Sequence, residues 1–345
     1  MADKPKKINI AFNGFGRIGR NLVRKLISDD RYNIVAINAR TTVNVRAHLF
    51  KYDSVHGMFN GDVSFELDNL IIDGHTIPNF SRKMPARLPW KELEVDFVID
   101  STGKFTNKHD LEQHIEAGAK NVIVTSPAKD VDATLVYGVN ETSYKVQETN
   151  IISASSCTTT CLTPILKVLL KNYGIKQGTM TTVHSFTMGQ TLLDSSHPDL
   201  RRARSATMSI IPTTTGAAKN VGVIIPELEG KLDGLAIRVP VPDVSLLDLS
   251  IELETDTTME EVVEVFEKEK KLHGILCVSH EPLVSVDYIG NSCSAIVDVL
   301  SSMMINKRLL KLIAFYDNEY GYCCRVLDLL QHLAKKLPQP STPSK

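Results

Sequence analysis

A cysteine stands where a hydroxyl-rich run gives way to an apolar segment, within the stretch Ser153 to Cys161. The apolar residues that follow, from Leu162 to Leu170, recur at helical spacing, so the pattern predicts a helix that begins near Cys157. The partial positive charge at a helix N-terminus is expected to lower the pKa of a thiol and favour the nucleophilic thiolate. Cys157 is therefore a candidate nucleophile. The alternative is that Cys157 and Cys161 are buried structural thiols.

A second candidate for chemistry is a glycine-rich turn near the N-terminus. The residues from Ile8 to Asn13 form an apolar run typical of a buried strand, and a helical pattern follows the turn. In such a motif the glycines allow a tight turn, close approach of a pyrophosphate and close helix packing. With a further strand expected at 33–38, the pattern predicts a dinucleotide site. The cofactor contacts expected here are Gly14, Gly16, Arg17, Ile18 and Gly19.

The residues after the second strand bear on which dinucleotide binds. An acidic residue about twenty positions after the last glycine would bind the 2′-hydroxyl of the adenosine ribose. Ala39 occupies this position and Arg40 follows it, so a guanidinium stands where a carboxylate would repel a 2′-phosphate. The sequence therefore favours NADP. The alternative is that Arg40 is a solvated surface charge and that NAD or NADP binds.

Further strands and helices alternate through the first half of the chain. Strands are expected at 96–100 and 121–125, with a helix at 109–117 between them. Alternation of this kind predicts a mostly parallel, doubly wound sheet whose ligands lie beyond the carboxyl ends of the strands. The residues expected to contact the cofactor there, unless they only shape turns, are Ser101, Thr102, Gly103 and Thr125.

Beyond Cys157 the pattern changes to long strands, for example at 177–185 and 244–253, with an amphipathic helix at 259–270. We therefore expect an α/β Rossmann-type dinucleotide-binding domain followed by an α+β catalytic domain with a mostly antiparallel sheet. The predicted division is a dinucleotide-binding domain at 1–156, a catalytic and oligomerisation domain at 157–317, a C-terminal helix returning to the first domain at 318–337, and a frayed tail at 338–345.

Composition narrows the class of protein. The 345 residues carry a net charge of −1 and no long basic run, so neither a nucleic acid nor a membrane is expected as a partner. Six cysteines without a signal peptide point to a reducing, cytoplasmic location. Cys323 and Cys324 are adjacent, and Cys157 and Cys161 lack histidines at ligand spacing, so no metal site is expected.

Several segments in order resemble the phosphorylating glyceraldehyde-3-phosphate dehydrogenase family over nearly the whole chain. The matching segments are Asn13 to Arg20, Lys51 to Gly57, Ser156 to Thr159, Asp199 to Arg204, Ile210 to Lys219, Ala236 to Pro240 and Tyr316 to Tyr322. This resemblance implies oxidative phosphorylation of D-glyceraldehyde 3-phosphate to 1,3-bisphosphoglycerate, and the reverse reduction, with NAD(P) as cofactor. It also implies a homotetramer that takes glyceraldehyde 3-phosphate and inorganic phosphate.

The resemblance assigns roles to particular side chains. Cys157 would form a hemithioacetal and then a thioester, while His184 stabilises the thiolate and takes the hydroxyl proton. Thr187 and Arg238 would hold the phosphate of the substrate, and Asn318 the nicotinamide carboxamide. The site for the attacking phosphate would comprise Ser156, Thr158, Arg202, Thr215 and Gly216. Lys83 is a further expected cofactor contact.

The sequence also departs from the usual family pattern. Ser195 and Ser196 replace a usual Leu-Pro pair that reaches the adenosine site of an adjacent subunit, which resembles NADP-using photosynthetic relatives. Ala39 and the segment 101–105 resemble gluconeogenic bacterial forms. Ala154 and Thr160 replace usual asparagines, and Gly189 replaces a usual aspartate. Two rival functions therefore stay open: an erythrose-4-phosphate dehydrogenase, whose attacking group is water, and a catalytically weak binding protein.

Overall fold

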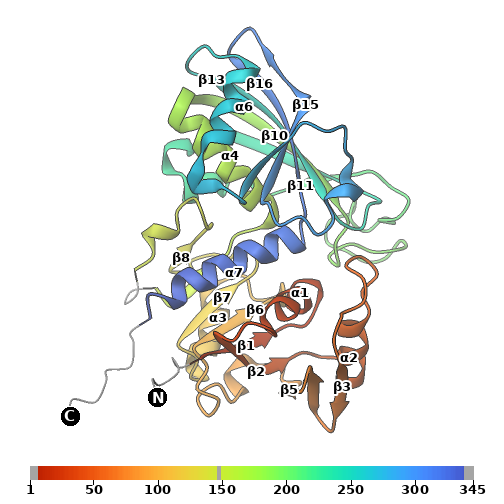
Figure 1. Ribbon diagram of the computed structural model, residues 1–345. Coiled ribbons are helices and arrows are strands. Elements are labelled where there is room, and N and C mark those ends of the chain that lie inside the picture. Colours follow the sequence, from red (N-terminus) through yellow and green to blue (C-terminus); the bar gives the residue numbers. More distant parts are fainter. Residues whose placement is uncertain (1–6, 146–148, 338–345) are drawn as a thin grey trace, which may run out of the picture.

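The computed structural model describes residues 7–145 and 149–337, and the tail predicted at 338–345 lies outside the described residues. The chain forms two sheets, each with its own helices, and the long helix α7 (Tyr320–Ala334) lies between them (Figure 1). No helix within the described ranges is apolar over a length that would cross a membrane.

The first sheet has nine strands in the order β3-β4-β5-β2-β1-β6-β7-β9-β8. Its centre is parallel, and β3, β4 and β5 pair antiparallel at one edge. Its strands and helices are β1 (Ile8–Asn13), α1 (Arg17–Leu26), β2 (Tyr32–Asn38), α2 (Val43–Lys51), β3 (Val63–Glu66), β4 (Asn69–Ile72), β5 (His75–Phe80), β6 (Phe97–Asp100), α3 (Lys108–Glu116), β7 (Asn121–Val124), β8 (Ala133–Thr134) and β9 (Ile151–Ser153).

The second sheet has seven strands in the order β11-β12-β10-β13-β16-β15-β14. Most neighbours are antiparallel, but β10 pairs parallel with β12 and β14 with β15. Its elements are α4 (Cys157–Tyr173), β10 (Ile175–Ser185), β11 (Ile211–Thr214), α5 (Val221–Ile224), β12 (Leu232–Val239), β13 (Ser245–Leu253), α6 (Met259–Lys268), β14 (Leu276–Ser279), β15 (Ala295–Ile305) and β16 (Leu309–Tyr316). Short 3₁₀ helices occupy Pro85–Arg87, Glu141–Ser143, Pro226–Leu228, Lys270–Leu272 and Ser285–Tyr288.

The helix that carries Cys157 is anchored by its apolar face. Leu162, Ile165 and Leu166 of α4 are fully buried and share one core with Leu247 and Leu249 of β13. Burial of each such side chain contributes roughly 1.5–3 kcal/mol, so the start of α4 is held firmly against the second sheet.

Helix α7 completes the first domain although it comes last in the chain. Val326, Leu329, Leu330 and Leu333 are buried in the same core as the strands of the first sheet. The turn that enters α7 leads from the second sheet, so residues just before the helix lie at the boundary between the two sheets (Figure 1).

The expected fold class is confirmed: a parallel-rich dinucleotide-binding sheet precedes a mostly antiparallel one. Several boundaries differ from the predictions by one to three residues: β10 begins at Ile175 and not at residue 177, and the helix expected at 259–270 ends at Lys268 and continues as a 3₁₀ turn. A capping box between Thr258 and Glu261 starts this helix, as their spacing favours.

Candidate active site

The turn that presents Cys157 is strained and buried. Cys157 is the first residue of α4, and Ser156 caps the helix by accepting a 3.1 Å hydrogen bond from Thr159 N. Ser155 has a φ of 58°, in the left-handed region that favours glycine, and its buried Oγ has no partner among the described residues. Tyr322 of α7 donates a 3.3 Å hydrogen bond to Ser155 O. Strain of this kind persists where the surroundings hold a functional residue in place.

Cys157 faces a histidine from a different element. Its Sγ lies 3.5 Å from Nε2 of His184, near the end of β10. The other ring nitrogen, Nδ1, lies 2.7 Å from Ser185 O. Nδ1 also lies 2.8 Å from Nη1 of Arg238, which only donates, whereas the carbonyl oxygen only accepts, so the two contacts favour opposite tautomers. The mechanism proposed below uses the tautomer with the ring proton on Nδ1. Nε2 is then free to accept a proton from the thiol.

The pKa values describe a neutral pair in the free protein. Burial raises the pKa of the Cys157 thiol, and the charge of Arg238 and the hydrogen bonds of Thr158 oppose it without overcoming it. Burial, together with the nearby charge of Arg238, lowers the pKa of His184 to about 3. The prediction that the helix N-terminus lowers the pKa of Cys157 is therefore wrong for the free protein, because desolvation of the thiolate outweighs it.

Two arginines bring positive charge to this pair. Arg238 of β12 lies opposite His184 in the register of β10 and donates a 2.8 Å hydrogen bond to Ser185 O. Its buried Nε has no partner among the described residues. Arg202 donates to Thr213 Oγ1 at 2.9 Å, and its charge also acts to lower the pKa of His184. The two guanidiniums therefore make the site favourable for anions.

The remaining residues of the expected phosphate sites differ in burial and in the elements that carry them. The hydroxyl of Thr158 is buried and pairs with Tyr316 Oη at 2.8 Å, so this side chain faces the core. Thr215 and Gly216 follow β11, and Arg202 Nη2 donates to Thr214 O at 3.1 Å, which joins Arg202 to that segment. Thr187 is exposed in the turn after β10.

Asn318 lies next to the histidine. Its Oδ1 accepts hydrogen bonds from Ser185 Oγ at 2.9 Å and Ser245 Oγ at 2.7 Å, and the residue is buried. Ser185 directly follows His184, so the amide of Asn318 is fixed on the same strand end as the catalytic candidate. This position just before α7 could not be inferred from local sequence pattern.

The glycine-rich turn opens onto a cavity of about 330 Å³ at the carboxyl end of the first sheet. A Cβ on Gly14 would come within 2.7 Å of Ser101 C, and one on Gly19 within 2.5 Å of Gly14 O, while one on Gly16 would meet nothing within 4 Å. Backbone packing thus requires two of the glycines, and the third leaves room for a pyrophosphate. The expected cofactor residues that line the cavity are Gly14, Gly16, Ala39, Arg40, Lys83, Ser101 and Thr102.

Sequence reasoning missed other basic residues of this cavity. The additional basic residues that line it are Arg20, Arg46, Arg82 and Lys104. No carboxylate lines it among the described residues. Arg46 is buried and donates to the carbonyl oxygens of Ala39 and Thr41, so it shapes the segment where a ribose would lie. A hydrophobic-periodicity analysis gives no signal for a buried arginine.

Several expected cofactor residues lie outside that lining. The Arg17 side chain forms ion pairs with Asp53 and Glu319, so only its backbone at the start of α1 is available to a phosphate. The Ile18 carbonyl accepts a contact from the Cys323 thiol. Thr125 donates from Oγ1 to Asp100 O at 3.2 Å, and Gly103 has a φ of 65°. Ser195 and Ser196 are exposed in the loop after β10.

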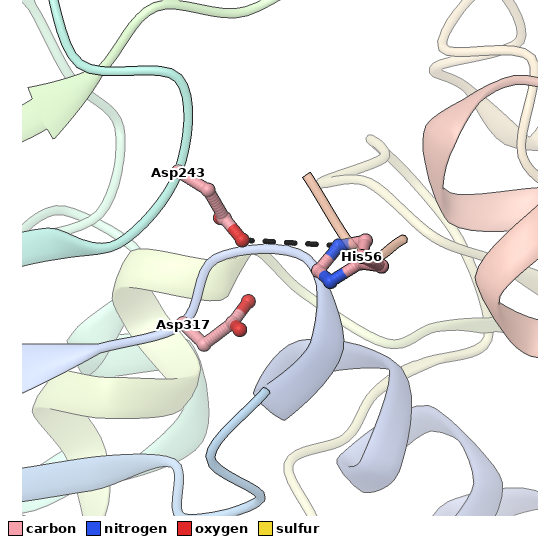
Figure 2. A group of neighbouring side chains, drawn as sticks. All are labelled: His56, Asp243 and Asp317. Atoms are coloured by element: carbon pink, nitrogen blue, oxygen red, sulfur yellow. Dashed lines mark ion pairs between the residues drawn. The ribbon is translucent and has the colours of Figure 1, made fainter. Parts of the chain in front are cut away.

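A cluster of charged side chains lies where the two domains meet. His56, Asp243 and Asp317 place one ligand atom each within 4.8 Å of one another (Figure 2). His56 Nε2 also lies 2.9 Å from Glu319 Oε2. Burial and the charges of Asp317 and Glu319 raise the pKa of Asp243 to about 8, and neither of its oxygens has a hydrogen-bond partner among the described residues. The spacing of cysteines and histidines, from which metal ligands are predicted, gives no signal for His56, Asp243 and Asp317, because these three residues are too far apart in sequence.

The departures from the family pattern at Ala154, Thr160 and Gly189 fall in different surroundings. Ala154 and Thr160 are buried around the nucleophile turn, where they take part in packing. Gly189 lies in the exposed turn after β10, and a Cβ there would meet only Thr187 Oγ1, at 3.7 Å. Space for a longer side chain is therefore available at Gly189.

A glycine-rich strand–turn–helix joined to a thiol beside a neutral imidazole is the arrangement expected of a nicotinamide-dependent dehydrogenase with a covalent intermediate. Comparison with known proteins gives a more specific result. Residues 8–108 match the NAD binding domain of glyceraldehyde 3-phosphate dehydrogenase, and residues 156–318 match its C-terminal domain. The chain belongs to the glyceraldehyde-3-phosphate dehydrogenase family.

Individual relatives agree over almost their whole length. Glyceraldehyde-3-phosphate dehydrogenase 2 of Bacillus subtilis is 50% identical over 337 residues, which cover 97% of this chain and 99% of that protein. The enzyme of Geobacillus stearothermophilus is 49% identical over 95% of this chain and 99% of its own. Glyceraldehyde-3-phosphate dehydrogenase 2 of Trichormus variabilis is 48% identical over the same shares.

Proposed function

We propose that this protein oxidises and phosphorylates D-glyceraldehyde 3-phosphate to 1,3-bisphosphoglycerate, and runs the reverse reduction, with NAD(P) as cofactor. The observation that carries the proposal is the 3.5 Å approach of Cys157 Sγ to His184 Nε2, with Arg238 beside the imidazole. Family membership supports the same activity.

The first step forms a carbon–sulfur bond. His184 Nε2 takes the thiol proton as Cys157 Sγ attacks the aldehyde carbon, which gives a hemithioacetal. The imidazolium and the backbone N–H of Cys157 stabilise the oxyanion of the adduct, and the imidazolium then gives its proton to that oxygen, which completes the hemithioacetal and leaves His184 neutral. A neutral His184 suits this role, because a histidine with a pKa near 3 is unprotonated before the attack.

The second step is oxidation of the adduct. His184 takes the hydroxyl proton while the carbon gives up a hydride, which leaves a thioester on Cys157. The bound cofactor supplies the hydride acceptor. We propose that Asn318 holds its carboxamide, which is supported by the burial of Asn318 and its two serine hydrogen bonds beside His184.

The third step transfers the acyl group to inorganic phosphate. An oxygen of phosphate attacks the thioester carbon, the thiolate of Cys157 leaves, and an acyl phosphate forms. We place this phosphate near Ser156, Thr158, Arg202, Thr215 and Gly216, with the phosphate of the substrate near Thr187 and Arg238. The unpartnered Nε of Arg238 supports an anion there.

We further propose that NADP is the preferred cofactor. The cavity carries Ala39 where an acidic residue would exclude a 2′-phosphate, and Arg40 with Arg82 and Lys83 line the same region. Exposed Ser195 and Ser196 would reach the adenosine site of a neighbouring subunit. Arg17, Ile18, Gly19, Gly103 and Thr125 would support the cofactor from the adjoining turns.

We also propose a cytoplasmic homotetramer with the domain division 1–156, 157–317 and 318–337. The loop after β10 supports association, because Met188, Leu192 and Leu193 leave most of their surface exposed, as do Leu200 and Met208. Light scattering after size exclusion would test this state, and a monomer at micromolar concentration would contradict it.

Steady-state kinetics tests the proposed reaction most broadly. Glyceraldehyde 3-phosphate and erythrose 4-phosphate are each assayed with NAD and NADP, with and without inorganic phosphate. The proposal predicts phosphate-dependent turnover of glyceraldehyde 3-phosphate and a higher kcat/KM with NADP. Phosphate-independent turnover of erythrose 4-phosphate would favour the rival dehydrogenase, and no turnover of either aldehyde would favour a binding protein.

A further inference from the structure

Two cysteines of the second domain are bonded to each other. Cys277 of β14 and Cys293, just before β15, form a disulfide with Cα atoms 6.1 Å apart and a sequence separation of 16. The remaining cysteines, among them Cys157, are free thiols. A reducing location does not lead one to expect such a bond, because intracellular disulfides are mostly transient or redox-sensing.

The surroundings of the pair allow chemical access from one side. β14 is the last strand of its sheet, and Cys277 on it is partly exposed, whereas Cys293 is buried. Cys293 packs in a small apolar cluster with Tyr288, Ile296 and Phe315, against which Cys277 also packs. A soluble disulfide or thiol can therefore reach Cys277 first, and Cys293 is positioned to complete the exchange.

The segment that carries Cys293 is packed against the start of α7. Gly290 N donates a 2.8 Å hydrogen bond to Asp317 Oδ2. At Gly321 an added Cβ would lie 2.9 Å from Cys293 O and 3.0 Å from Asn291 O, so the two backbones are in close contact. The 290–294 segment thus forms one wall for the turn that leads into α7.

That turn contains Asn318. Asp317 Oδ1 accepts from Glu319 N at 2.9 Å and from Tyr320 N at 2.6 Å, so the Asp317 carboxylate folds the turn around Asn318 while its other oxygen holds Gly290. A covalent bond at Cys293 restrains the segment on which Asp317 rests. Direct contacts therefore lead from the Cys293 segment through Asp317 to the turn that holds Asn318.

We propose that Cys277 and Cys293 are a reversible dithiol–disulfide pair that tunes cofactor binding through the Asn318 turn. The thiolate of Cys277 attacks the disulfide of a small cyclic disulfide oxidant, which forms a mixed disulfide and frees one thiol of the oxidant. The thiolate of Cys293 then attacks Cys277 Sγ, breaks the mixed disulfide and expels the oxidant as a dithiol. The pair loses two protons and two electrons, and the oxidant becomes a dithiol. The coupling to cofactor binding rests on the proposed role of Asn318, whereas the redox chemistry does not.

The chemistry is tested in the full-length Cys157→Ser protein, so that the candidate nucleophile does not react. The protein is equilibrated across ratios of reduced to oxidised dithiothreitol, alkylated and mapped by mass spectrometry. We expect one transition in which Cys277 and Cys293 together lose access to the reagent and their peptides become joined. Alkylation of both cysteines at every ratio would overturn the proposal whatever the enzyme activity is.

The effect of the disulfide on cofactor binding is tested by steady-state kinetics of the wild-type protein with Cys277 and Cys293 oxidised or reduced. Because the bonded segment is preorganised, we expect the KM for the cofactor to be roughly two- to tenfold lower in the oxidised protein. Cys277→Ser and Cys277→Ala should lose this difference, and Cys324→Ser, which alters a partly exposed cysteine outside the pair, should keep it. An equal KM in both states of the wild type would overturn the coupling.

Discussion

Cys157 and His184 belong to different elements of the second domain, one at the start of α4 and one near the end of β10, and the two reactive atoms lie 3.5 Å apart. The burial of both side chains favours uncharged forms, so the pair holds one proton on sulfur before any substrate binds. In the proposed mechanism the imidazole therefore serves as a base that becomes charged only when the sulfur attacks.

Replacement of the imidazole isolates its role as a base. The amide of asparagine in His184→Asn fills a similar space, but it has no basic nitrogen that could accept the thiol proton as His184 Nε2 does. We expect kcat to fall by roughly 10²- to 10⁴-fold, with the Kd for cofactor little changed. Stopped-flow measurement of cofactor reduction checks the first quantity and fluorescence titration the second. A variant with near wild-type hydride transfer would exclude His184 from the proton steps.

The raised pKa of Cys157 predicts how the free protein reacts with alkylating reagents. Because burial destabilises the thiolate, the rate of reaction with uncharged iodoacetamide should keep increasing with pH above the ordinary thiol pKa, about 8.5. The measurement is the loss of activity with time across a pH series, with peptide mapping to confirm the site. A plateau already reached near neutral pH would show that the thiolate is stabilised after all.

The cofactor preference is tested at the position after β2. A carboxylate in Ala39→Asp would face the 2′-phosphate of NADP, and we expect the Kd for NADP to rise roughly tenfold or more while that for NAD changes little. Ala39→Ser adds a polar group without charge and serves as the matched control. If both variants retain the wild-type ratio of the two Kd values, Ala39 plays no part in cofactor choice.

The charged cluster between the domains predicts a pH-dependent stability. Asp243 has a pKa of about 8 in the folded protein against 3.8 in a solvated chain, so its proton stabilises the fold at low pH. This contribution is fully present below pH 3.8 and is lost progressively as pH rises from there to about 8. Asp243→Asn keeps the shape and removes the titration. We expect it to raise Tm relative to wild type at about pH 8, and much less at about pH 5.

Thermal scans at one protein concentration measure that difference, and Glu227→Gln, a change at an exposed carboxylate, is the control. The same Tm difference between Asp243→Asn and wild type at both pH values would contradict the assignment. His56, Glu319 and Asp317 are the titratable groups that face Asp243 from the other elements, so their titration is part of the wild-type reference.

Local pattern was sufficient for the parts of the site that are contiguous in sequence. The order strand, glycine turn, helix predicted the cofactor turn at Gly14 to Gly19, and the hydroxyl-rich run predicted the start of α4. Contacts between distant segments were not predictable in this way. The partner of Cys157 comes from β10, and its position depended on the family resemblance.

The balance between the helix terminus and desolvation, which sets the pKa of Cys157, was also not predictable from the sequence. The helix terminus predicted a lowered pKa for Cys157, but desolvation, which depends on the packing of the whole domain, has the larger effect. The buried Arg46, the buried Asp243 beside His56 and the bond between Cys277 and Cys293 likewise arise from tertiary contacts. Each depends on contacts between residues that are far apart in sequence and show no periodic pattern.

The most direct test of the account is the mass of the protein during a single turnover without phosphate. Rapid mixing with glyceraldehyde 3-phosphate and NADP, followed by an acid quench, should trap one acyl group per chain on the peptide that contains Cys157. Addition of inorganic phosphate should remove the acyl group, and Cys157→Ser should never acquire it. Reduction of the cofactor with no adduct on Cys157 would contradict the proposed thioester.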